Sequence, residues 1–405
     1  MSRDVTRPLY QAAAPKLRSF GGLVWFLAIG AGVGVANVYY VQPVLPLLRE
    51  TFGASPEEAS LVPALTQAGY AAGMFFLAPL GDLFDRKRLI IAKAIILAFA
   101  LVAFAVAPNL QLLTLAGVVV GLLGSIGQDF VPVAAHIAAD GHQARTVGIV
   151  TTGLLTGILL SRTLGGIVGD LLGWRAIYWL AAGTVALVGG MVWRVLPSFP
   201  AAASGTYRDL LQSLATLIRQ HAGLRKAVVT QALLAVSLGA FWSTLALMLA
   251  EPPYQLGASA AGAFGFAGAA GALGAPLFGH LADRRGPDIA IRFGCLLVIL
   301  SFGAMMLLPG LLVVLVAGAI LFDLGVMAGL VSHQAIVNAI DPKARSRLNG
   351  LLMTAAMIGM ALGAAVGGWA WSRHGWTGVC LVGATAGAAA LLRSLLPPTK
   401  RGELS

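Results

Sequence analysis

The chain has 405 residues, of which 58% are hydrophobic and only 11% are charged, and its mean hydropathy is +0.85. Soluble globular domains carry about 25% charged residues, so this composition excludes an ordinary soluble domain. The formal net charge of +11 would suit a nucleic-acid-binding protein, but the basic residues are scattered between apolar stretches. The composition therefore indicates a protein embedded in a lipid bilayer.

Apolar segments long enough to cross a bilayer, which takes about 20 residues, recur along the whole chain. In the first half they lie at 21–47, 59–80, 89–107, 110–137, 146–169 and 174–196. In the second half they lie at 227–250, 259–279, 289–309, 311–337, 347–371 and 377–396. The sequence thus predicts an all-α integral membrane protein with twelve transmembrane helices, arranged as two six-helix halves at 21–196 and 227–396.

Polar segments lie at the two ends and in the middle of the chain. Residues 1–20 precede an apolar stretch that is too long for a signal peptide, so we expect a cytoplasmic N-terminal segment and a retained first span. Residues 197–226 form a cytoplasmic linker, in which the stretch from Tyr207 onward has helical periodicity and predicts a surface helix. Residues 397–405 are expected to form a cytoplasmic tail.

The placement of lysine and arginine predicts the orientation. If both termini are cytoplasmic, 23 of the 27 basic residues, including Lys93, fall on the cytoplasmic side. Arg49, Arg175 and Arg373 fall outside, and Arg162 lies within a span. Such a bias is typical of cytoplasmic loops. It explains the positive charge by topology, so no nucleic-acid partner is expected.

Two polar loops are near copies of each other. Gly81 to Arg88 follows the second span, and Gly279 to Gly286 follows the eighth span, 198 residues later. In the same relation, Asp140 follows the fourth span and Asp341 follows the tenth. Duplication at half-length is how many transporters are built, and it predicts two pseudo-symmetric halves.

These residues resemble the major facilitator superfamily over the whole chain. The 279–286 string agrees with the loop signature of that family, Gly-x-Leu-Ala-Asp-Arg-x-Gly, and the 81–88 copy lacks the late glycine. The runs at 37–43, 241–244 and 344–349 look like a bacterial subgroup of efflux permeases. The resemblance implies a transporter of the bacterial inner membrane.

The fifth span resembles the signature of drug:proton antiporters. Gly148, Gly157, Gly165 and Gly166 match its glycine spacing, although Ser161 and Arg162 replace its Gly-Pro pair. The same glycines could simply allow close helix packing, since small residues let helices approach each other in lipid.

Ionisable groups inside spans are rare because a charge in lipid is costly, so each is a functional candidate. Arg162 lies deep in the fifth span, Asp323 near the middle of the tenth, and Asp129 nearer the cytoplasmic end of the fourth. Desolvation makes a carboxyl group easier to protonate, which gives Asp323, and then Asp129, a role in proton coupling. Arg162 keeps its charge and would hold an anionic group. A structural ion pair or hydrogen-bond network is the alternative.

Polar and aromatic residues in two spans are candidates for the substrate cavity together with Arg162. Asn37, Tyr40 and Gln42 lie in the outer half of the first span, just before a proline, and Trp242 lies in the seventh span. A tyrosine near the membrane surface also serves as an anchor, which leaves two roles open for Tyr40. No paired His or Cys has metal-ligand spacing, so neither a metal nor a cofactor is expected.

The resemblance implies that the two repeated loops latch the cytoplasmic side closed in one state of the transport cycle. Asp85 and Asp283 each precede a helix, whose free amides a carboxylate can cap. Simple topology anchoring by the arginines is the alternative. The predicted gating residues are Gly81, Asp85, Arg86, Arg88, Asp140, Gly279, Asp283, Arg284, Gly286 and Asp341.

The combined features predict a secondary active transporter that works by rocking its two halves. No Gly-x4-Gly-Lys-Ser/Thr string for ATP occurs, so a proton gradient is the expected driving force. Proton-coupled efflux of a small amphiphilic compound is the first hypothesis, and symport of a small anionic metabolite is the second. A membrane-embedded sensor or enzyme is a remote third, and we expect no enzyme. The expected partners are the substrate, protons and the bilayer, without an obligate protein partner.

Overall fold

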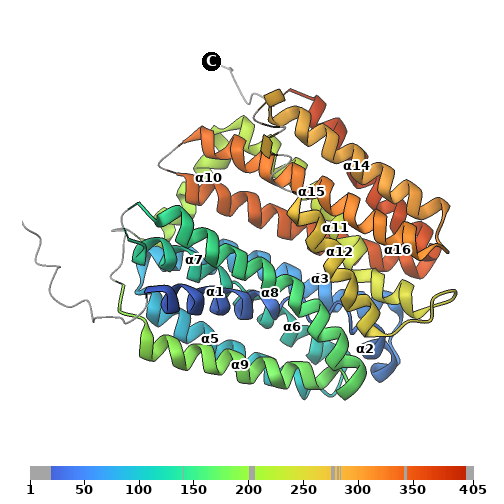
Figure 1. Cartoon of the computed structure of the whole chain (residues 1–405), viewed down its shortest axis with the longest axis horizontal. Helices are drawn as coiled ribbons and strands as arrows, with labels where there is room; N and C mark the ends of the chain where they lie inside the picture. The colour runs from blue at the N-terminus through green and yellow to red at the C-terminus, as the bar shows by residue number, and fades with distance from the viewer. Residues whose placement is uncertain are drawn as a thin grey trace, which may run out of the picture.

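The computed structural model describes residues 20–139, 141–199, 206–274, 279–280, 282, 284–341 and 344–397. Within these ranges the secondary structure is helical, without strands. The helices run side by side in one bundle, with those of the first half in the lower part of Figure 1 and most of those of the second half in the upper part. Asp140, Asp283, most of the N-terminal segment and most of the tail lie outside the described residues.

The first half contains a helix or a series of helices for each of its six predicted spans. They are α1 (Phe20–Ala36), α2 (Leu45–Phe52), α3 (Pro56–Ala72), the π-helix η1 (Gly73–Leu77), α4 (Leu80–Leu83), α5 (Arg86–Ala105), α6 (Leu110–Gly124), α7 (Ile126–Ile137), α8 (Gln143–Leu172) and α9 (Trp174–Val195). The first span is broken by turns at 37–44, which separate α1 from α2 around Pro43. The second span consists of α3, η1 and α4 in series.

The second half also has a described helix within each of its six predicted spans. It contains α11 (Ala222–Ala250), α12 (Ala258–Leu273), α14 (Pro287–Leu307), α15 (Leu312–Ile340) and α16 (Arg345–Leu395). Gly375 interrupts α16 with φ 55° and ψ −146°, a conformation that glycine adopts without steric cost, and so divides α16 into two spans. Among the described residues, nine helical segments are long and apolar enough to cross a membrane, and α1 is a shorter apolar helix. The prediction of an all-α membrane protein is confirmed.

A short helix in the linker, α10 (Tyr207–Gln220), lies across one end of the bundle. Thr206 and Asp209 form a capping box at its start, and these hydrogen bonds from the Thr206 hydroxyl and backbone hold the pKa of Asp209 below its usual value. Leu214 and Leu217 pack against apolar residues of α11, α15 and α16. The Tyr207 hydroxyl donates to the carbonyl of Phe76 at 2.8 Å, so α10 contacts both halves.

The two halves meet along two helix pairs, α3 with α16 and α8 with α12. A side chain at Gly166 of α8 would collide with the backbone of Ala258, and one at Gly368 of α16 would collide with Ser60 of α3. These close approaches lie near the end of the bundle that carries α2, which we call the α2 end. The opposite end, which carries α4 and α10, is called the α10 end.

Candidate functional site: a closed polar cluster and an open cavity between the halves

Arg162 lies on α8 where the two halves touch, and its side chain is buried. Its Nε donates to Oε1 of Gln42 at 2.9 Å. Its guanidinium carbon lies 3.9 Å from the ring centroid of Trp242 on α11 and 5.2 Å from that of Tyr39. Desolvated contacts between a cation and an aromatic face contribute about 2 kcal/mol. Arg162 therefore contacts one aromatic ring of each half.

Asp323 lies behind Trp242, on the α15 side of this cluster. The indole Nε1 of Trp242 donates to Oδ1 of Asp323 at 3.4 Å. Gly268 of α12 leaves room for the carboxyl group, since a Cβ there would lie 2.7 Å from Oδ2 of Asp323. Asp323 is buried, and no described basic residue lies within ion-pair distance of it. A buried carboxyl group thus lies next to, but not in contact with, a buried cation.

The space around Arg162 is too small for a substrate. The cavity there measures about 10 Å³, which is roughly the room that one water molecule needs. Its lining consists of Gln42, Pro43, Arg162, Trp242, Leu245, Ala246 and Ala261. The polar cluster is therefore closed in this conformation.

Further contacts between the halves hold the α2 end together. The carboxylate of Asp170, at the end of α8, accepts from the backbone N–H groups of Ala258 and Ser259 at 2.9 and 2.7 Å and so caps the start of α12. Arg49 pairs with Glu251 at 3.5 Å across the same end. Each of these contacts joins a residue of the first half to one of the second half.

The α10 end is open by comparison. A cavity of about 300 Å³, at the lower limit of small-molecule sites, lies between the halves there. Its lining comes from η1, α4, α5, α7, α10 and α16 and includes Asp82, Arg86, Gln128, Asp129, Arg347 and Asn349. The structure is thus closed at the α2 end and hollow at the α10 end.

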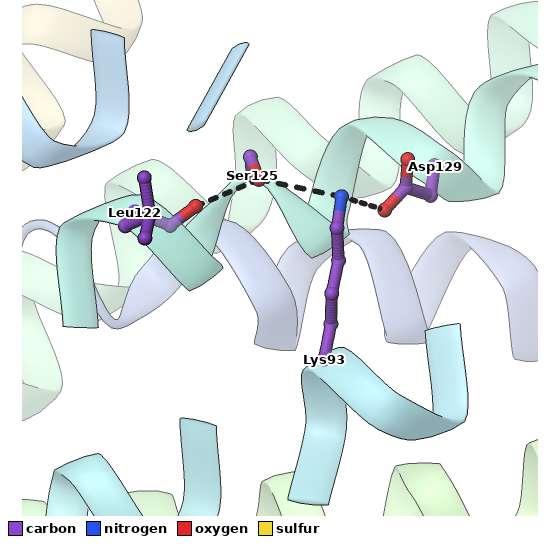
Figure 2. Close-up of polar contacts among 4 residues, drawn as sticks. All are labelled: Lys93, Leu122, Ser125 and Asp129. Atoms are coloured by element: carbon purple, nitrogen blue, oxygen red, sulfur yellow. Dashed lines mark hydrogen bonds and ion pairs between the residues drawn. The ribbon is translucent and has the colours of Figure 1, made fainter. Parts of the chain in front are cut away.

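A second buried charge cluster borders this cavity (Figure 2). Nζ of Lys93 on α5 lies 2.6 Å from Oδ2 of Asp129 on α7 and 3.5 Å from Oγ of Ser125, which donates to the carbonyl of Leu122. Both charged side chains are 3% exposed. Lys93, which the sequence groups with the basic residues of the cytoplasmic side, lies within α5 with its side chain buried. Asp129, predicted as a second coupling acid, is ion-paired.

Two of the predicted substrate-binding residues lie apart from the Arg162 cluster. Asn37, which directly follows α1, donates to the carbonyls of Val33 and Gly34 of that helix. Tyr40 packs edge-on against Tyr178 of α9, with ring centroids 6.4 Å apart. Their predicted role in the substrate cavity stays a prediction. Tyr39, which sequence analysis missed, faces Arg162 instead, and only the turn geometry at 37–44 decides which neighbour points inward.

The loop after α4 has the capping arrangement expected of it. Asp85 caps α5, since its Oδ1 accepts from the N–H groups of Lys87 at 2.8 Å and of Phe199 at 3.2 Å. Arg86 pairs with Asp82 at 2.6 Å and lies over Gly81. Of the remaining predicted gating residues that the structure describes, Arg88 and Arg284 are exposed, Asp341 is half-buried after α15, Gly279 precedes α14, and Gly286 caps α14 with φ 89°.

Three of the four predicted packing glycines lie at helix contacts. Gly157 faces Gly32 of α1, Gly165 faces Tyr40 and Pro43, and Gly166 faces α12. Gly148 contradicts the prediction, because a Cβ there would meet nothing within 4 Å.

Among the described residues no group of three or more His, Cys, Asp or Glu side chains could hold a metal ion.

Comparison with known proteins places this architecture among transporters. Residues 27–340 match the family model of the Major Facilitator Superfamily. The uncharacterized transporter YgaY of Escherichia coli O157:H7 is 36% identical over 370 residues, which are 91% of this chain and 94% of that protein. The multidrug resistance protein MdtG of Serratia proteamaculans is 25% identical over 296 residues, 70% of this chain and 71% of that protein. The solved structure of the nucleoside transporter NupG has a TM-score of 0.78 at 15% identity, covering 92% and 99% of the two chains, and shows the likeness of fold alone.

Proposed function

The chain belongs to the Major Facilitator Superfamily and is a membrane transporter, and from this premise we propose that it exports a small amphiphilic compound in exchange for protons. The distant similarity to a multidrug resistance protein supports export. The excess of basic residues supports a cytoplasmic α10 end. The conformation described above is then inward-facing, one state of an alternating-access cycle.

The observation that carries the proposal is the burial of Asp323 without an ion pair to any described basic residue. A buried carboxylate without a paired cation is costly in a membrane, and a bound proton removes most of that cost. Protonation of Asp323 would therefore favour the state in which the α2 end is closed around it. Deprotonation would favour the state in which water reaches the carboxylate. In an antiporter, the open side must depend on protonation in this way.

The proton and the substrate then move in opposite directions. A proton taken up by Asp323 from outside lets the α2 end close and opens the cavity at the α10 end. Binding of the substrate from the cytoplasm and release of the proton return the protein to the outward-open state. Arg162 keeps its charge throughout the cycle. Its hydrogen bond to Gln42 and its contact with the Trp242 ring form each time the α2 end closes.

A second candidate is uptake of a small anion together with a proton. It is supported by Arg162, which has no carboxylate within ion-pair distance among the described residues and could receive an anionic group. In that case an anion gradient would drive proton uptake into vesicles, whereas a cationic or neutral amphiphile would have no effect.

Purified protein in liposomes with a trapped pH-sensitive dye tests the proposal. An inward proton gradient should drive export of an amphiphilic probe such as ethidium, and an ethidium gradient should drive proton flux in the opposite direction. The exposed Asp209→Asn variant is the control and should behave as wild type. Transport of ethidium and of every other amphiphile in a panel without any accompanying proton flux would refute proton exchange.

A further inference from the structure

A third cavity, distinct from the two between the halves, lies between α1 and α8. It measures about 560 Å³. Its lining includes small residues, among them Gly32, Gly148, Gly153 and Gly157. Trp25 of α1, which is 64% exposed, also lines it. All of the residues that line this groove belong to the first half, whereas the cavity at the α10 end is lined by both halves.

The groove follows α8 through most of the membrane. Its lining on α8 begins at Arg145 and ends at Leu164, 19 residues further, which is about 28 Å along the helix. The hydrocarbon core of a bilayer is about 30 Å thick, so the groove is long enough to hold an entire acyl chain. Large apolar side chains of α8, such as Leu160 and Leu164, are exposed beside it.

The charge that lines the groove is positive and lies at one end. Arg145, in the first turn of α8, is the one ionisable side chain with a full charge at neutral pH among its seventeen lining residues. Arg145 is exposed, and no acidic residue lines the groove. Guanidinium groups bind phosphate through paired hydrogen bonds. A cation at the membrane surface above a long apolar groove matches the chemistry of an anionic phospholipid.

We propose that the groove between α1 and α8 binds an anionic phospholipid, with its phosphate at Arg145 and one acyl chain along the glycines of α8. The open space at Gly148 supports this occupant, since no side chain of the protein fills it. The groove also contains Tyr40 and Ser161, which are sequence neighbours of Tyr39 and Arg162, so the lipid would contact the two helices that hold the closed cluster. The proposal does not depend on the substrate or on proton coupling.

Native mass spectrometry of the purified protein with phosphatidylglycerol or phosphatidylethanolamine tests this site. The wild-type protein should retain phosphatidylglycerol about tenfold better, because the ammonium group of phosphatidylethanolamine offsets the charge of its phosphate at Arg145, whereas phosphatidylglycerol keeps a net negative charge. Arg145→Gln should abolish this preference, and Gly148→Trp, which fills the groove, should lower retention of both lipids. Gly183→Trp on α9 is the matched control, because Gly183 is exposed and a Cβ at this position would also meet nothing within 4 Å.

Each result separates the proposal from its alternatives. Equal retention of both lipids by the wild-type protein, or unchanged retention by a folded Gly148→Trp protein, would overturn it. Displacement of phosphatidylglycerol by a transport substrate would assign the groove to the substrate and would also overturn it. Arg145→Gln keeps the test available if Gly148→Trp does not fold, because the Arg145 side chain is exposed on the surface of α8.

Discussion

Replacing Asp170 by alanine should open the α2 end. In the structure both carboxylate oxygens of Asp170 accept hydrogen bonds from the other half, from the backbone of Ala258 and Ser259 at 2.9 and 2.7 Å. Hydrogen bonds to a charged group contribute about 1.5–3 kcal/mol when they are buried. Asp170 is exposed, so solvent screening reduces this value, and about 1–2 kcal/mol for the two bonds together is a reasonable magnitude.

This magnitude sets the size of the expected change. Since 1.4 kcal/mol is a factor of ten, the loss of both bonds should shift the equilibrium toward the open state by about 5- to 30-fold. An open state with a population of about 1% would rise to about 5–25%. Asp170→Asn should have a smaller effect, because one amide oxygen can still accept a bond.

Distances between spin labels across the α2 end measure this population. Labels at Glu50 of α2 and His374 of α16 lie on different halves, and both side chains are exposed. Asp170→Ala should add a longer distance to the distribution, whereas Asp209→Ala on α10 should not. An unchanged distribution in a folded Asp170→Ala protein would show that this cap does not hold the α2 end closed.

Three further outcomes follow from the same contacts. Arg162→Lys should impair transport strongly although the charge is kept, because an ammonium group cannot reproduce both the stacking on Trp242 and the bond to Gln42; full transport by this variant would contradict that role. Lys93→Ala should lower the thermal stability of the protein, with a cost of about 3–5 kcal/mol for the unpaired Asp129, and a double variant with Asp129→Leu should recover most of it; equal melting temperatures of the single variant and wild type would argue against a buried pair. A reporter fused after Gly205 should be cytoplasmic and one at Ser55 external, and an external signal at Gly205 would reverse the assigned orientation.

The helices of this protein are largely predictable from sequence, because a span in lipid needs a long apolar run and little else. The break at Gly375 falls between two predicted spans, and α10 begins at Tyr207, where its periodicity starts. The ends of the spans also agree to within a few residues, as for 174–196 and α9 (Trp174–Val195).

The site is less predictable because it depends on contacts between spans. Arg162, Gln42 and Trp242 were candidates individually, but no sequence pattern within α8 or α11 predicts that these two helices lie together. Tyr39 could not be preferred to Tyr40, since the turns at 37–44 decide which side chain faces α8. The Lys93–Asp129 pair, in contrast, has a signal in the sequence.

That signal is a lysine inside one apolar span and an acid inside the next. Lys93 lies seven residues beyond the start of α5, about 10 Å into the helix, where an unpaired ammonium group would be costly. A search for opposite charges in consecutive spans would pair it with Asp129 from the sequence alone.

The most direct test of proton coupling compares net transport with exchange for Asp323→Asn in liposomes. Exchange of labelled for unlabelled substrate needs binding and rocking, but no net movement of protons. We expect the Asp323→Asn protein to exchange substrate while failing to drive it against a gradient with protons. Uphill transport by this variant at the wild-type rate, with unchanged pH dependence, would contradict the coupling role of Asp323.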